Sequence, residues 1–177
     1  MAGTESIVLG GGCFWCLDAL YRRVKGVTNV TSGYAGGESG KPSYWDLHSP
    51  GNTHAEVVQV TFDSRQIDLH TILGIFWAMH DPTTLNKQMY DEGPEYRSII
   101  LFNSKEQKKV IDQSIEDTAK ELWSKPITTE IKPLEEFWPA EDYHQDYFNK
   151  NPEQGYCQVI INPKLAKFKH KFSHLLK

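Results

Sequence analysis

Two cysteines near the start of the chain, Cys13 and Cys16, follow a run of three glycines. A short strand-like segment precedes the glycines and a segment of helical composition follows Cys13, so Cys13 lies at a strand-to-helix turn. Backbone N–H groups and the positive end of a helix dipole stabilise a thiolate at such a turn. We therefore interpret Cys13 as a nucleophilic thiol. The alternative is a buried cysteine that packs as a small apolar side chain.

The same two cysteines have the CxxC spacing of redox dithiols, because successive helical turns bring both sulfurs to one side. A thiol-disulfide oxidoreductase acting on protein disulfides would use them in this way, although a frame of parallel strands is not evident in the sequence. Phe14 and Trp15 lie between the cysteines. These two aromatic residues serve either as core residues or as an apolar wall for a methyl or thioether group.

Glu56 is unusual because it shares the face of an alternating segment with three apolar side chains, Val58, Val60 and Phe62. Desolvation on that face would raise the pKa of its carboxyl group, as suits a general acid that holds its proton at pH 7. If the strand instead begins at Val57, Glu56 lies in solvent. Both interpretations remain open at this point.

Further polar side chains come from two loops, residues 32–52 and 83–95. The first is long for a compact domain and is expected to be functional. A phenol or carboxyl that assists catalysis would come from Tyr44 or from the run 91–96.

The seven histidines are scattered, and neither an HExxH motif nor a paired CxxC spacing occurs. We predict no metal. Zinc held by Cys13, Cys16, Cys157 and His144 defines a non-enzymatic alternative, a small zinc-binding interaction module.

The elements that must position these residues follow from length and pattern. A chain of 177 residues fits a single domain over 1–177. Alternation and helical spacing predict strands at 6–9, 27–31, 56–62, 98–102 and 127–131, and helices after Cys13, Asp68 and Ser104, at 141–148 and in the tail. The order favours an α+β fold, a ferredoxin-like two-layer α/β sandwich with a mainly antiparallel sheet and long loops.

Charge and composition exclude several classes of protein. The net charge of -4 argues against nucleic acid or an anionic membrane as the main partner. Three cysteines are too few for a disulfide-stapled secreted fold. The start of the chain lacks the features of a secretion signal, and no apolar stretch of about 18 residues is present. We expect a cytoplasmic protein.

Seven segments together resemble the A-type peptide methionine sulfoxide reductases, and they span most of the chain in family order. They are GGCFWC at 11–16, SGYAGG at 32–37, PSY at 42–44, HAEVVQVTFD at 54–63, HDPTTLNKQ at 80–88, DEGPEYRS at 91–98 and AEDYHQDY at 140–147.

The resemblance implies a role for each matching residue. It makes Cys13 the nucleophile and Glu56 the proton donor, with Phe14 and Trp15 around the substrate methyl group. It also implies that the sulfoxide oxygen is bound by Tyr44 and Tyr96, that Asp91 is a supporting acid, and that His144 belongs to the substrate site.

The implied reaction repairs the S epimer of free and protein-bound methionine sulfoxide, a product of oxidative stress. The Cys13 thiolate attacks the sulfoxide sulfur and becomes a sulfenic acid, which a second thiol converts to a disulfide. Thioredoxin or another dithiol then reduces the disulfide. No bound cofactor is implied, and we expect a monomer.

Two cysteines compete for the role of resolving thiol. Cys157 lies in NPEQGYC, which resembles the late resolving segment of many family members, on a tail expected to be mobile. Cys16 stands where the family often has glycine, and attack across a helical turn is geometrically demanding. We favour Cys157, with Cys16 as the second choice or as part of a relay. The loop 48–56 and the pair Met89 and Tyr90 depart from the family pattern.

Overall fold

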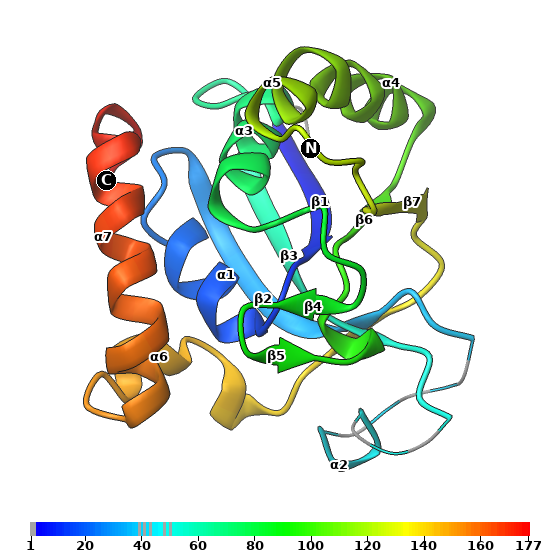
Figure 1. Ribbon diagram of the computed structural model, residues 1–177. Helices are drawn as coiled ribbons and strands as arrows, with labels where there is room; N and C mark the ends of the chain where they lie inside the picture. Colours follow the sequence, from blue (N-terminus) through cyan, green and yellow to red (C-terminus); the bar gives the residue numbers. More distant parts are fainter. Residues whose placement is uncertain (1–2, 39, 41, 43, 48, 50) are drawn as a thin grey trace.

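The computed structural model describes residues 3–38, 40, 42, 44–47, 49 and 51–177. Its centre is a six-stranded sheet in the order β7-β6-β1-β3-β2-β8, in which all neighbours are antiparallel except β6 and β7 (Figure 1). A two-stranded hairpin, β4–β5, lies beside it. The strands are β1 (Thr4–Gly10), β2 (Val27–Ala35), β3 (Ala55–Asp63), β4 (Lys87–Gln88), β5 (Asp91–Glu92), β6 (Ile99–Phe102), β7 (Glu130–Pro133) and β8 (Phe137–Pro139).

The helices connect and cover these strands. Asp68 caps α3 by accepting a hydrogen bond from Thr71, and Ser104 caps α4 in the same way from Gln107, as the sequence predicts. The helices are α1 (Phe14–Tyr21), α2 (Tyr44–Leu47), α3 (Leu69–Met79), α4 (Lys105–Ser114), α5 (Lys120–Leu122), α6 (Tyr147–Lys150) and α7 (Asn162–Lys171). Short 3₁₀ turns are η1 (Pro94–Tyr96), η3 (Asp142–His144) and η5 (Ser173–Leu175), and π-helical turns are η2 (Ile115–Ala119) and η4 (Cys157–Ile161).

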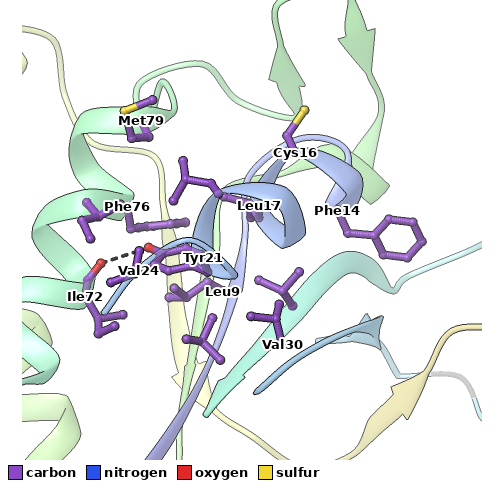
Figure 2. Packing of buried hydrophobic residues seen from close by; sticks show 14 of the residues in the cluster. Leu9, Phe14, Cys16, Leu17, Tyr21, Val24, Val30, Ile72, Phe76 and Met79 are labelled. Atoms are coloured by element: carbon purple, nitrogen blue, oxygen red, sulfur yellow. Dashed lines mark hydrogen bonds between the residues drawn. The ribbon is translucent and has the colours of Figure 1, made fainter. Parts of the chain in front are cut away.

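The main core lies between one face of the sheet and helices α1, α3 and α7. Figure 2 shows Leu17 and Tyr21 of α1 pointing toward Phe76 and Ile72 of α3, where the Tyr21 hydroxyl donates to the Ile72 carbonyl oxygen over 2.9 Å. Each such buried side chain contributes about 1.5–3 kcal/mol. The packing therefore fixes α1, which carries both Cys13 at its N-cap and Cys16, relative to the sheet.

The mixed α/β class and the mainly antiparallel sheet are confirmed, whereas the ferredoxin-like description stays a prediction. Among the described residues, no helix is both long and apolar enough to cross a membrane.

Several boundaries predicted from the sequence are wrong. Strand β2 continues to Ala35 inside the segment predicted as loop, because its polar end pairs with β3 and with β8, which the sequence did not predict. The strand predicted at 127–131 is found at Glu130–Pro133. The helix predicted at 141–148 is two short turns, interrupted at Asp146 with a left-handed φ of 52°. The loop 83–95 contains the β4–β5 hairpin.

Candidate active site

The turn before Cys13 is shaped by closely packed glycines. Gly12 has a φ of 87°, which favours glycine, and its N–H donates to the carbonyl oxygen of Tyr96 over 3.1 Å. A Cβ atom on Gly11 would lie 2.7 Å from the ring of His80. The turn leads directly into α1, and the Cys16 N–H donates to the Cys13 carbonyl oxygen over 3.1 Å. Cys13 thus lies at the N-terminus of α1, as predicted.

Glu56 lies at the start of β3 with only 2% of its surface exposed, so of the two interpretations of the sequence the buried one is correct. The backbone N–H of Phe14 donates to its Oε1 over 3.0 Å. Burial raises the pKa of the Glu56 carboxyl to about 8, and the negative charges of Asp91 and Glu95 act in the same direction. The carboxyl is therefore protonated at neutral pH.

The Cys13 thiol is partly exposed and interacts with the Glu56 side chain. Burial raises the pKa of Cys13 well above its usual value, and the charges of Glu56 and Cys16 raise it further. The expected lowering by the helix N-terminus is therefore outweighed. A carboxylate and a thiolate this close together repel each other, so in the free protein both groups hold their protons.

A cavity of about 210 Å³ opens beside Cys13 and brings several functional groups together. Cys16 and Asp91 line it with Cys13, as does Tyr156 from the C-terminal segment. The Tyr156 hydroxyl donates to Asp91 Oδ2 over 2.6 Å and lies 3.9 Å from Cys16 Sγ. Lys164 also lines the cavity, and its charge partly offsets the burial that raises the pKa of Cys16.

Aromatic rings gather around the start of α1. Phe14 is fully buried, with its ring centroid 5.1 Å from that of His144. Trp15 is partly exposed, stacks on Tyr147 at 3.7 Å, and donates from Nε1 to His144 Nδ1 over 3.1 Å. Burial lowers the pKa of His144, so its ring is neutral and its Nδ1 accepts this hydrogen bond.

Tyr96, the second predicted tyrosine, lies in η1, next to the Cys13 turn through its hydrogen bond with Gly12. Its pKa is raised by burial and by the charges of Glu56 and Cys13, so the phenol keeps its proton. Tyr44 begins α2, but its side chain lies outside the described residues.

Cys157 is placed differently from the expectation. The sequence predicts a mobile tail, but Cys157 is fully buried at the start of η4, which continues into α7. Cys157 is not among the described residues that line the cavity beside Cys13, although its neighbour Tyr156 is. The three cysteines are free thiols.

The sequence interpretation missed Tyr156, Lys164 and Asp18. Tyr156 directly precedes Cys157, which was a usable signal. Asp18 is a buried carboxylate on α1 that accepts hydrogen bonds from Arg22, from the Ser32 hydroxyl over 3.1 Å and from the Asp146 N–H over 3.1 Å. In the part of the chain that the structure describes, no group of three His, Cys, Asp or Glu side chains is arranged to hold a metal ion.

Comparisons with known proteins agree with this geometry. A family model described as peptide methionine sulfoxide reductase matches residues 5–176. The peptide methionine sulfoxide reductase MsrA of Pseudarthrobacter chlorophenolicus is 54% identical over 169 residues, which cover 96% of this chain and 97% of that protein.

Two solved structures are also similar. The structure of methionine sulfoxide reductase A of Corynebacterium diphtheriae has a TM-score of 0.82 at 34% identity and covers 90% of this chain and 80% of its own. The structure of Mxr1 from Saccharomyces cerevisiae in complex with Trx2 has a TM-score of 0.54 at 26% identity, with coverage of 82% and 85%.

Proposed function

Because the chain belongs to the peptide methionine sulfoxide reductase family and is therefore an oxidoreductase that reduces methionine sulfoxide, we propose that Cys13 and Glu56 carry out the reduction. The observation that supports this most directly is a buried carboxyl, with its pKa raised to about 8, held beside a thiol at a helix N-terminus. A disulfide exchange enzyme would need the thiol but not the proton donor. We therefore place the CxxC oxidoreductase second.

In the first step, the Glu56 carboxyl donates its proton to the sulfoxide oxygen, which makes the substrate sulfur electrophilic. The Cys13 sulfur attacks that sulfur, and the thiol proton passes to the Glu56 carboxylate. The protonated oxygen then passes from the substrate sulfur to the Cys13 sulfur while the bond between the two sulfurs breaks, which leaves a sulfenic acid on Cys13 and releases methionine. Because both groups start protonated, the step needs no outside proton.

The sulfoxide oxygen gains negative charge as the S–O bond breaks. The Tyr96 phenol and the Tyr156 hydroxyl lie near Cys13, and we assign Tyr96 as a hydrogen-bond donor to this oxygen. We also retain Tyr44 as a donor, from its sequence motif. Asp91 holds Tyr156 by a 2.6 Å hydrogen bond and supports the site in this way.

The substrate methyl group requires an apolar surface. Trp15 is partly exposed, and its orientation is fixed by stacking on Tyr147 and by the hydrogen bond to His144. Its ring therefore offers that surface. Phe14 is fully buried and supports the wall from behind. A fixed wall on one side and a proton donor on the other distinguish the two epimers, and we propose the S epimer as substrate.

For the second step we propose a relay of thiols. Cys16 lies one helical turn from Cys13 and lines the same cavity, so it attacks the Cys13 sulfenic acid first, forming a disulfide and releasing water. Cys157, which the sequence favours, is buried and does not line that cavity as described. It then exchanges with the Cys13–Cys16 disulfide once η4 moves, forming Cys16–Cys157 and freeing the Cys13 thiol.

A protein dithiol of the thioredoxin type closes the cycle by reducing the final disulfide. The similarity to a yeast reductase solved in complex with Trx2 supports this partner. We propose free and protein-bound methionine sulfoxide as substrates for a single-domain, monomeric, cytoplasmic enzyme without a bound cofactor.

Sulfoxide turnover with dithiothreitol tests the proposal. The wild-type protein is expected to reduce the S but not the R epimer of a methionine sulfoxide peptide, and Cys13→Ser is expected to abolish the activity. Equal reduction of both epimers would exclude the assigned geometry.

Mass mapping of the disulfides after one equivalent of sulfoxide tests the relay. A Cys13–Cys16 link is expected at early times, with Cys16–Cys157 later, and only the early link in Cys157→Ser. An early Cys13–Cys157 link in the wild type would refute Cys16 as the first resolving thiol.

A further inference from the structure

A second cavity, of about 540 Å³, adjoins the cavity that contains Cys13. We name it the side groove. It shares four lining residues with the first cavity: Gln88, Met89, Ile160 and Lys164. Its volume falls within the range of about 300–1,000 Å³ that is typical of ligand sites. The four shared residues make the two cavities direct neighbours on the surface.

The floor of the side groove is apolar. Met79 is almost fully buried there, and Trp123 extends the floor toward the α5 end. Two apolar side chains on its edges are open to solvent, Met89 with 58% and Val159 with 69% of their surface exposed. Large apolar side chains gathered around an open cavity mark a surface that binds a partner or substrate.

The edges of the groove also carry positive charge. Three lysines line it: Lys87, Lys164 and Lys167. Among its described lining residues there is one carboxylate, that of Asp81, which accepts from the Thr83 N–H over 2.9 Å and from the Thr83 hydroxyl over 2.5 Å. The groove is therefore locally positive on a chain with a net charge of -4, which suits an acidic ligand.

We propose that the side groove binds the polypeptide next to a methionine sulfoxide residue and favours segments that combine an apolar side chain with an acidic one. This rests on the proposed function. When a methionine side chain of a polypeptide enters the Cys13 cavity, its backbone neighbours advance about 3.3 Å per residue along the adjoining surface. Because the side groove adjoins the Cys13 cavity, it is the surface that these neighbours meet in the proposal, and its apolar floor and its lysines set the preference.

A protein dithiol must also approach this side of the molecule, because the proposed final disulfide contains Cys16, which lines the Cys13 cavity. It acts after sulfoxide reduction, whereas a substrate segment acts before it. A single turnover without external reductant therefore isolates the contribution of the substrate.

The test compares two methionine sulfoxide substrates in single turnovers. One is N-acetylmethionine sulfoxide amide, and the other is a peptide with leucine and glutamate on both sides of the methionine sulfoxide. Lys167→Glu is expected to lower the ratio of the second-order rate constants, peptide over small substrate, by about two- to five-fold. Lys169→Glu is the matched control, because Lys169 is an exposed lysine on the same helix outside the groove lining, and its ratio should equal that of the wild type.

The apolar part of the proposal has its own test. Val159→Ser is expected to lower the same ratio by about two- to five-fold. Leu85→Ser is the control, because Leu85 is 72% exposed but does not line the groove. A peptide with serine and glutamine in place of leucine and glutamate should show no loss in either groove variant.

Three outcomes of these comparisons would contradict the proposal or the function on which it rests. Equal ratios in wild type, Lys167→Glu and Val159→Ser would overturn the side groove as a substrate site while leaving sulfoxide reduction intact. Loss confined to steady-state turnover with thioredoxin would assign the surface to the reductant instead and would equally overturn the proposal. Failure of the wild type on both substrates would contradict the proposed function itself.

Discussion

The proton on Glu56 links the chemistry of the site to the stability of the fold. Its pKa is about 8 in the folded protein and close to 4.5 in an unfolded chain. Between these values the folded state holds a proton that the unfolded state has lost. The folded state is therefore destabilised as pH rises through this window, and the effect is constant above pH 8. This loss of stability is the consequence of keeping the Glu56 carboxyl protonated at neutral pH.

Glu56→Gln is expected to remove this dependence, because an amide does not titrate. The gain in free energy of unfolding over wild type should increase by about 3–4 kcal/mol between pH 5 and pH 8. Urea denaturation of both proteins at several pH values, with reductant present, measures it. His80, with a pKa lowered to about 3 by burial, acts in the opposite direction below pH 6.5 in both proteins, so only the difference is diagnostic. A constant difference would contradict a neutral Glu56 carboxyl.

Replacement of Gly11 tests whether close packing against the His80 ring fixes the turn before Cys13. A Cβ atom there would lie 2.7 Å from the His80 ring, which cannot move because its Nδ1 is bonded to the Phe76 carbonyl oxygen and its Nε2 to Ser98 Oγ. Gly11→Ala is expected to cost about 1–3 kcal/mol in urea denaturation, since overpacking forces a shift of the turn. Gly74→Ala, in open space within α3, should be neutral or stabilising. Equal changes in the free energy of unfolding for the two variants would show that the turn before Cys13 shifts at little cost.

At the scale of elements, Asp18 joins helix α1 to strand β2 and to the segment that carries His144. Its carboxylate accepts hydrogen bonds from Ser32 and from the backbone N–H of Asp146, and forms an ion pair with Arg22. Removing a buried carboxylate leaves these donors without an acceptor. The helix, the strand and the aromatic wall around Trp15 would then be held only by packing.

Asp18→Ala is therefore expected to lower the free energy of unfolding by about 3–5 kcal/mol. Asp112→Ala is the control, since Asp112 is exposed and pairs only with Lys108 in α4 among the described residues, and it should change stability by less than about 1 kcal/mol. Thermal or urea denaturation measures both. A small loss for Asp18→Ala would mean that packing alone fixes the wall.

Local sequence features predicted several elements of this fold, whereas pairing between distant segments could not be predicted. The side-chain alternation at Glu56 and the caps at Asp68 and Ser104 are local, so they predicted β3, α3 and α4 correctly. Contacts between distant segments are not local. The polar end of β2 became a strand only because β3 and β8 pair with it.

The candidate site was predictable to the same extent. The glycines before a helical segment placed Cys13, alternation offered a buried Glu56 as one of two interpretations, and motif resemblance adds Tyr96 and Asp91. Tyr156 reaches the cavity because the C-terminal segment folds back, and no spacing in the sequence encodes that.

At the scale of the whole molecule, the C-terminus is attached to the turn that follows α1. Val24 and Leu176 form an isolated antiparallel bridge, the Lys25 N–H donates to the Leu175 carbonyl oxygen over 2.8 Å, and the Lys177 N–H donates to the Arg23 carbonyl oxygen over 2.9 Å. Helix α7 lies beside α1 between this attachment and η4 (Figure 1). The segment that carries Tyr156 and Cys157 is thereby held at its far end.

Deletion of residues 173–177 is expected to lower the free energy of unfolding by about 1–3 kcal/mol, because the two backbone hydrogen bonds of the bridge and the packing of the terminal apolar residues are lost. It should also accelerate formation of the Cys157 disulfide, since η4 opens more easily without the attachment. Rapid quenching with mass mapping measures the second effect against the wild type. A slower disulfide would mean that the attachment positions Cys157 and does not restrain it.

Met89, whose side chain lies where the side groove meets the Cys13 cavity, is more than half exposed. Oxidants that create the substrate of this enzyme also attack exposed thioethers, and a sulfoxide at Met89 would place a polar, chiral group on an apolar wall. The entrance therefore becomes less suited to polypeptide substrates as oxidant rises. A second molecule of the same enzyme can reduce the S epimer at Met89, so recovery of this surface depends on other copies of the enzyme and is limited to that epimer.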